Sequence, residues 1–288
     1  SDLKALMEQA ERTQRLSVDL ETTSRQPNAA DIVGIALCVP GQPAVYVPVA
    51  HRETDGVAQM SRPQALEILK PVLEDPNIQK LGQNLKYEHI VFKRADVTLR
   101  GIAEDSMIAA YVLDPARPSY SLDALARNIL GHENIQYNEV TQGGKLGFAE
   151  VPIAQATLYA AEDAEVALRL CEALIPKLQQ EGLETLYREV EMPLVPVLAN
   201  MERHGIGMDG TKLEHLSAEL GIRIKALEQE LQDLVGQQVN LASPKQLSML
   251  FFETLKYPVV KKTKTGYSTD QEVLETLAAH YEPPRLVL

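Results

Sequence analysis

The sequence of 288 residues is poor in cysteine and has no long apolar run. Its two cysteines, Cys38 and Cys171, stand far apart with no C-x-x-C pair, which excludes a disulfide framework and a cysteine zinc site. No stretch approaches the ~18 apolar residues of a membrane helix, and the charged N-terminal segment lacks the apolar core of a signal peptide. We therefore expect a soluble protein of a reducing compartment that has no membrane partner.

Basic residues are outnumbered, because 28 Lys and Arg face 40 Asp and Glu and leave a net charge of −12. This balance speaks against a chain that coats nucleic acid by charge alone. Residues 244–266 depart from it, with a single acid, Glu253, and five lysines: Lys245, Lys256, Lys261, Lys262 and Lys264. This basic island is either a solvated loop or a loop that contacts phosphates, and charge alone leaves both interpretations open.

The first part of the chain mixes strand and helix patterns. Residues 16–20, 32–39 and 44–49 are β-rich runs separated by turn residues, which predicts a three-stranded meander. Ser61 and Gln64 form a capping-box pattern ahead of a helix, and residues 78–81 read as a short strand. Further helices are expected over residues 85–94, 106–113, 122–129 and 153–174. The order predicts an α/β domain with a mixed sheet that ends near Gly182.

The rest of the chain has almost no strand signal. Helical patterns cover residues 184–204, 211–235, 244–252 and 270–280, and leucines on one stripe of 211–235 predict a long antiparallel or coiled arm. We therefore expect two domains, residues 1–182 and 183–288, which also suits the rule of ~150 residues per domain. Because the last residues form no closing element, we expect the sequence to be a piece of a longer chain.

Three groups of polar side chains have the spacing of a shared face. Asp19 and Glu21 alternate along the first strand, where two adjacent carboxylates repel unless a cation or a proton separates them. Tyr159 and Asp163 are four apart on a helix, as are Asn84 and Glu88, which places each pair on one helical face. Alone, the Asp19–Glu21 pair is more typical of a solvent-facing polar edge than of a metal site, and the helical pairs are weak signals. Together, three acidic stations can surround a pair of divalent metal ions.

These residues together resemble the three exonuclease motifs of the DEDD nucleases, in the variant that has tyrosine in the third motif. The sequence around these motifs most resembles the proofreading domain of bacterial family A DNA polymerases, the Klenow-type fragment. The likeness runs nearly end to end, through segments 66–71, 82–87, 100–103, 159–164 and 191–198, and residues 243–247 and 261–263 resemble the thumb. The resemblance implies a ribonuclease H-like mixed sheet flanked by helices, followed by a mostly helical thumb segment.

The resemblance also implies roles for particular residues. Four carboxylates fall at the metal-ligand positions, Asp19, Glu21, Glu88 and Asp163, and Tyr159 falls where a tyrosine orients the attacking water. The positions that contact nucleic acid in the family are here Thr22, Arg25, Gln83, Asn84, Tyr87 and Tyr137, with Lys261, Lys262 and Lys264 in the thumb. Implied cofactors are two divalent cations, Mg²⁺ or Mn²⁺, with Zn²⁺ as an alternative ion at one site.

Two positions depart from the family pattern. Arg25 stands where the family has a leucine that wedges between the last bases, although a guanidinium can also stack on a base. Glu88 stands where the second motif ends in aspartate, so its carboxylate lies about 1.5 Å further out. Metal geometry tolerates errors of only ~0.2 Å, so we expect attenuation of activity more than its loss. Asp105 aligns with another aspartate of the family and is no obvious replacement.

The leading hypothesis is a proofreading 3′–5′ exonuclease that acts on single-stranded or frayed DNA in the bacterial cytoplasm. Its expected partners are a single-stranded 3′ end and a primer-template duplex, and we expect a monomer that joins the palm and fingers of the same polymerase if it is a fragment. The palm motifs D-Y-S and H-D-E are absent, so this chain alone is not expected to polymerise. The alternatives are a degenerate DNA-binding scaffold and a ribonuclease D-type RNA exonuclease, against which the thumb-like segment speaks.

Overall fold

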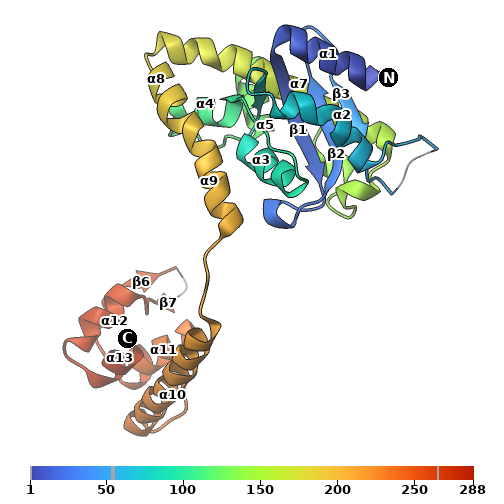
Figure 1. The fold of residues 1–288 in the computed structure, drawn as a ribbon. Coiled ribbons are helices and arrows are strands. Elements are labelled where there is room, and N and C mark those ends of the chain that lie inside the picture. The colour runs from blue at the N-terminus through green and yellow to red at the C-terminus, as the bar shows by residue number, and fades with distance from the viewer. Residues whose placement is uncertain (1, 53–55, 265) are drawn as a thin grey trace. The chain divides into compact units, whose positions relative to one another are not determined.

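The computed structural model describes residues 2–52, 56–264 and 266–288. The chain divides into two compact units, Ser1–Gly205 and Ile206–Leu288 (Figure 1). The helices between Gly182 and Gly205 group with the first unit, and the functional division of the chain at Gly182 stays a prediction. None of the described helices is both long and apolar enough to span a bilayer.

A five-stranded sheet forms the centre of the first unit, in the order β3-β2-β1-β4-β5. Its strands are β1 (Arg15–Thr22), β2 (Ile32–Cys38), β3 (Val45–Pro48), β4 (Gln79–Gly82) and β5 (Ile102–Asp105). The first three pair antiparallel, as the predicted meander requires, while β4 runs parallel to both β1 and β5. The mixed sheet is therefore confirmed, and β5 is a strand that the sequence analysis did not predict.

Helices cover both faces of this sheet (Figure 1). One face carries Leu16, Val18 and Leu20, which join a core with α1 (Asp2–Thr13), α2 (Arg62–Glu74) and α3 (Leu85–Arg94). The other face packs against α7 (Ile153–Gln180), the longest helix of the described chain. Alternation along β1 thus sends its leucines and valine to one core and leaves Ser17, Asp19 and Glu21 facing α7.

Shorter helices complete the first unit. They are η1 (Pro27–Ala29), α4 (Ser106–Leu113), α5 (Leu122–Leu125), η2 (Ala126–Leu130), α6 (Tyr137–Val140), η3 (Phe148–Glu150), α8 (Glu184–Leu186), η4 (Tyr187–Glu191) and α9 (Met192–His204). Tyr187 is fully buried, and its hydroxyl accepts a hydrogen bond from the Asp105 backbone N–H at 2.7 Å. This contact ties η4 to the end of β5.

The second unit is mostly helical, as predicted. It contains α10 (Gly210–Val235), α11 (Pro244–Ser248), η5 (Met249–Thr254), β6 (Lys262–Thr263), β7 (Gly266–Tyr267), α12 (Gln271–Ala278) and α13 (Glu282–Val287). Its small core includes Leu250, Phe251 and Val273. Within α10 only Leu231 is buried, so the predicted leucine stripe is largely exposed in the described part of this unit. The short hairpin β6–β7 lies in the basic island and was not predicted.

Candidate metal centre and nucleic-acid pocket

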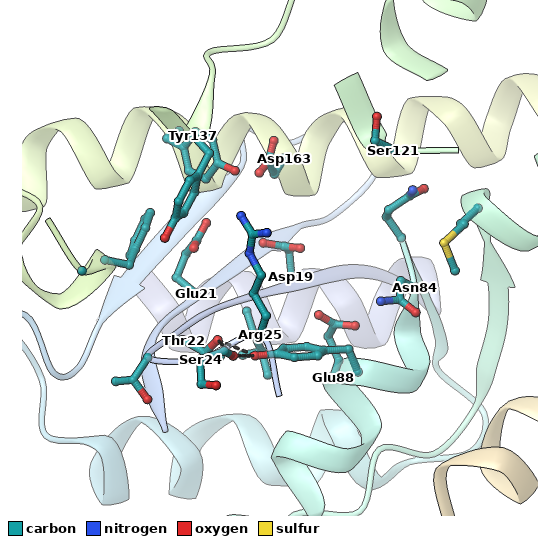
Figure 2. A pocket seen from close by; sticks show the side chains of 18 of the residues that line it. Asp19, Glu21, Thr22, Ser24, Arg25, Asn84, Glu88, Ser121, Tyr137 and Asp163 are labelled. Atoms are coloured by element: carbon teal, nitrogen blue, oxygen red, sulfur yellow. Dashed lines mark hydrogen bonds between the residues drawn. The ribbon is translucent and has the colours of Figure 1, made fainter. Parts of the chain in front are cut away.

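The acidic residues singled out from the sequence line one pocket of about 860 Å³ in the first unit. Asp19 and Glu21 come from β1, Glu88 from α3, and Tyr159 and Asp163 from α7. Figure 2 shows the Asp163 side chain facing the side chains of Glu21 and Asp19, with Glu88 approaching from the other side. The fold therefore brings together the carboxylates of the three groups, although these groups lie far apart in the sequence.

The strand that carries Asp19 and Glu21 packs closely against its neighbours. Glu21 pairs with Gly34 of β2, and a Cβ atom built on Gly34 would lie 1.9 Å from the hydroxyl oxygen of Tyr46. The glycine therefore leaves room for Tyr46, whose hydroxyl lies 2.7 Å from Nε2 of His51. On α7, the backbone carbonyl of Ala164 accepts a hydrogen bond from Ser17 Oγ at 2.8 Å. The Ser17–Ala164 bond fixes β1 against α7 beside the carboxylates.

Asp19, Glu21 and Asp163 form a tight carboxylate group. One oxygen from each lies within 4.8 Å of the others. Removal from water raises the pKa of Asp19 to about 6. Burial raises the pKa of Glu21 well above its usual range, and the charges of Asp19, Asp163 and Glu88 add to this effect. Because like charges at this separation oppose ionisation, the oxygen donors fit a divalent cation that would neutralise them.

Glu88 lies beside this group without joining it. Its side chain is 4% exposed, and its Oε2 atom is buried with no hydrogen-bond partner among the described residues. Burial raises the pKa of Glu88 well above its usual range, and the nearby charge of Asp19 raises it further. A buried carboxylate oxygen without a partner is costly unless a cation or a donor reaches it. This orphaned oxygen is the second observation that fits a bound cation.

Tyr159 reaches the same carboxylates from the turn of α7 before Asp163. A hydrogen bond from the Tyr159 hydroxyl lowers the pKa of Asp163, although burial and the charge of Asp19 raise it more. Burial raises the pKa of Tyr159 itself far above its usual range, so the phenol stays protonated. The predicted i, i+4 relation of these two residues thus holds in the structure, and it provides a neutral hydroxyl beside a carboxylate.

Aromatic rings form one wall of the pocket. Tyr137 stacks on Phe148 with ring centroids 6.3 Å apart and meets the edge of Tyr159 at 6.2 Å. The guanidinium of Arg25 lies over the Tyr137 ring, 5.9 Å from its centroid. Phe148 was missed from the sequence, because a lone aromatic residue after a glycine-rich stretch carries no periodic signal. The wall offers flat surfaces on which a base can stack.

The remaining predicted contact residues also line the pocket. Asn84 is not on a helical face as the spacing indicated; it adopts a left-handed conformation with φ of 62° and immediately precedes α3. It still lines the pocket. Gln83 donates a hydrogen bond to the Tyr120 carbonyl at 2.7 Å, and the Tyr87 hydroxyl bonds to the Thr22 hydroxyl and the Ser24 carbonyl. This region is therefore already fixed by internal hydrogen bonds.

The structure also gives the partners of Asp105 and Lys261. Asp105 is fully buried and accepts hydrogen bonds from the backbone N–H groups of Leu85, Met107 and Ile108. It therefore caps helices and is not among the residues that line the pocket. In the second unit, Lys261 lies 2.8 Å from Asp270 and 3.5 Å from Glu272, so its charge is partly balanced within the chain.

Two family models match successive parts of the chain. Residues 1–179 match the family described as 3′–5′ exonuclease, and residues 210–288 match DNA polymerase family A. DNA polymerase I of Pseudomonas aeruginosa is 41% identical over 99% of this chain and 32% of its own length. DNA polymerase I of Rhizobium leguminosarum is 39% identical over 97% of this chain and 29% of its own length.

A comparison of structures also finds a DNA polymerase. A structure described as the POL domain of Pol1 from M. smegmatis, in complex with DNA primer-template and dNTP, superposes with a TM-score of 0.80. It is 28% identical in sequence, and the match covers 99% of this chain and 45% of that one. The chain thus spans about a third of the length of the curated relatives named above.

Proposed function

The chain belongs to DNA polymerase family A and carries a 3′–5′ exonuclease domain, and from this premise we propose that it hydrolyses the 3′-terminal phosphodiester of single-stranded or frayed DNA. The products are nucleoside monophosphates. The observation that carries the proposal is the tight group of Asp19, Glu21 and Asp163, with the neutral phenol of Tyr159 beside it. Exonuclease domains of this kind use divalent metal ions, and the oxygen donors of this pocket fit them.

We assign the metal-holding role to the four carboxylates. Asp19, Glu21 and Asp163 would hold one ion, and Asp19 with the unpartnered oxygen of Glu88 would contribute to a second. Bound Mg²⁺ or Mn²⁺ supplies Lewis-acid stabilisation of charge on the phosphate oxygens and favours ionisation of water. Zn²⁺ is an alternative at the first site, since carboxylate oxygens also bind it.

The chain's own side chains then bind and orient the substrate. The Tyr159 hydroxyl, hydrogen-bonded to Asp163, is placed to orient an attacking water. The terminal base stacks on the Tyr137 ring, while Arg25 over that ring provides a cation for the adjacent phosphate. Gln83, Asn84 and Tyr87, which also line the pocket, hold the 3′ end, with Thr22 fixing the Tyr87 hydroxyl.

The second unit supports an additional proposal about partners. The related M. smegmatis protein is described in complex with a DNA primer-template. By analogy, Lys262 and Lys264 of the basic island contact the phosphates of a duplex, with Lys261 contributing less because of its acidic partners. Polymerisation is not proposed for these 288 residues, since they hold neither palm motif.

The test is digestion of a 5′-labelled single strand in Mg²⁺ and in Mn²⁺, followed on a denaturing gel. The parent chain is expected to shorten the strand one nucleotide at a time, and Asp19→Ala is expected to abolish this while keeping the circular dichroism spectrum. Asp31→Ala, which removes an exposed carboxylate outside the pocket, is the matched control. Digestion by Asp19→Ala at the parent rate would place the activity elsewhere.

One specific observation favours a second candidate, a DNA-binding scaffold with little activity. Glu88 lies outside the tight carboxylate group, so an ion that depends on it would be held weakly. A parent chain that binds a single strand but leaves it intact in both metals would support this candidate.

A further inference from the structure

Glu162 lies next to Asp163 on α7, yet its carboxylate is used differently. Its Oε2 atom accepts a hydrogen bond from the Ile135 backbone N–H at 2.7 Å. Its Oε1 atom lies 2.9 Å from Nε2 of His132. An ionised carboxylate can only accept, so the imidazole is the donor. Both oxygens are therefore occupied by one segment, residues 132–135, which has no regular secondary structure.

This segment supplies one direct contact to the pocket and leads into a second pocket residue. Asn134, which is 6% exposed, lies between the two residues that bond to Glu162, and its Nδ2 atom lies 3.4 Å from Asp163 Oδ1 as a hydrogen-bond donor. The Oδ1 atom of Asn134 is buried with no partner among the described residues, so its amide is oriented by Asp163 alone. The segment then leads through Gln136 into α6, whose first residue is Tyr137.

Tyr137 stands on the same side of the pocket as Asp163 (Figure 2). Its ring meets Tyr159, one turn before Asp163 on α7, at a centroid distance of 6.2 Å. The backbone of residues 132–135 is attached to α7 through Glu162, so the position of this ring depends on the same attachment. Tyr137 is 37% exposed, so its placement depends on this attachment as well as on its ring contacts with Phe148 and Tyr159.

We propose that Glu162 is a positioning residue for the exonuclease site. It clamps residues 132–137 onto α7, and through that segment it sets both the Asp163 carboxylate and the Tyr137 ring. The inference rests on the proposed function, but it concerns the placement of a metal ligand and of a stacking surface, which are measurable without catalysis. Outer contacts of this kind commonly affect metal affinity by about 10- to 100-fold.

The test compares four variants by two measurements. Mn²⁺ binding is followed by titration calorimetry, and binding of a fluorescein-labelled single strand is followed by anisotropy in EDTA. Glu162→Ala is expected to weaken Mn²⁺ binding about tenfold and single-strand binding about fivefold. Glu162→Gln keeps an acceptor for Ile135, so it should recover most of both affinities. Asn134→Ala should weaken Mn²⁺ binding alone.

Glu165→Ala is the matched control, because it removes the same charge from the same helix, and among the described residues the ion pair of Glu165 is with Arg169 at 3.8 Å. It is expected to behave as the parent. A folded Glu162→Ala with parent affinities would overturn the proposal, and so would equal losses in Glu162→Gln and Glu162→Ala. If Glu162→Ala does not fold, unchanged Mn²⁺ binding by Asn134→Ala overturns it. Failure of the parent to digest DNA would reject the exonuclease proposal and leave these binding comparisons standing.

Discussion

Asp105 Oδ2 accepts a hydrogen bond from the backbone N–H of Leu85 at 2.7 Å, which places this carboxylate behind the start of α3. Its other oxygen caps α4 through Met107 and Ile108. With both oxygens committed to backbone donors, Asp105 has no free acceptor for an ion near Glu88. It is therefore a structural residue of the strand end and not a substitute ligand.

The first prediction follows from this capping role. Asp105→Ala removes the acceptor for three backbone N–H groups, of which that of Leu85 is in a buried hydrogen bond, and is expected to lower the free energy of unfolding by about 1–3 kcal/mol. Urea denaturation measures the change, and Asp114→Ala, at an exposed aspartate beyond α4, serves as the control. If Asp105→Asn folded normally but lost Mn²⁺ binding as completely as Asp19→Ala, Asp105 would have to be a ligand after all.

The second prediction concerns Glu88, whose Oε2 atom is buried without a partner. Glu88→Asp restores the side-chain length of the resembled family, and misplacement of about 1 Å can cost on the order of 10²-fold in rate. We expect Glu88→Asp to raise digestion in Mg²⁺ at least about tenfold and Glu88→Ala to fall below the parent. Mn²⁺ should narrow the difference, because Mg²⁺ demands near-ideal octahedral geometry. Equal rates in all three would make Glu88 a bystander.

The third prediction concerns pH and the raised pKa of Asp19, about 6 in the folded chain against 3.8 without burial. Between these values the folded chain binds more protons than the unfolded chain, so this contribution to stability is present below about pH 4 and is lost as pH rises through 6. In EDTA, Asp19→Asn should gain on the order of 3 kcal/mol relative to the parent between pH 4 and 7.

Urea denaturation at each pH gives this difference, and Asp31→Asn, at an exposed aspartate, is the control. Added Mn²⁺ should stabilise the parent and leave Asp19→Asn nearly unchanged, because the ion relieves the repulsion that the substitution removes. A stability difference that stays constant over the whole pH range would contradict the raised pKa.

The fourth prediction concerns the basic island. Replacing Lys262 and Lys264 with Ala should weaken duplex binding and flatten the log–log salt dependence by ~2 units, at ~0.9 per phosphate contact. Replacing Lys261 as well should add less than one unit, because it lies 2.8 Å from Asp270. Lys4 and Lys177, exposed lysines of the first unit, give a double control. An unchanged slope would return the island to the solvated-loop interpretation.

Most of the architecture could be predicted from the sequence, because alternation of apolar and polar residues in strands and apolar stripes on helices indicate directly which side chains are buried. The strand with Leu16, Val18 and Leu20 was predicted on these grounds, and its polar face followed from the same period. By contrast, β5 holds only four residues and ends in two acids, Glu104 and Asp105, which masks its burial. Its existence depends on pairing with β4, a contact that no local pattern contains.

The site was predicted less evenly than the fold. Asp19, Glu21 and Asp163 could be assigned to one site because they resemble a known set of motifs. Their proximity in space depends on the whole fold. The left-handed conformation of Asn84 and the attachment of Glu162 to Ile135 could not be foreseen. Both depend on backbone geometry that only tertiary packing fixes, so periodicity gives no signal for them.

The packing of β1 against α7 has a consequence for the order in which the protein becomes functional. Ser17 bonds to Ala164, 147 positions later in the chain, and the Asp163 carboxylate arrives on the same helix. Contacts between segments so distant in sequence form late, and a ribosome delivers them in order from the N-terminus. All five strands are therefore synthesised before α7 covers the sheet and completes the carboxylate group. A growing chain lacks the assembled centre until that helix has emerged.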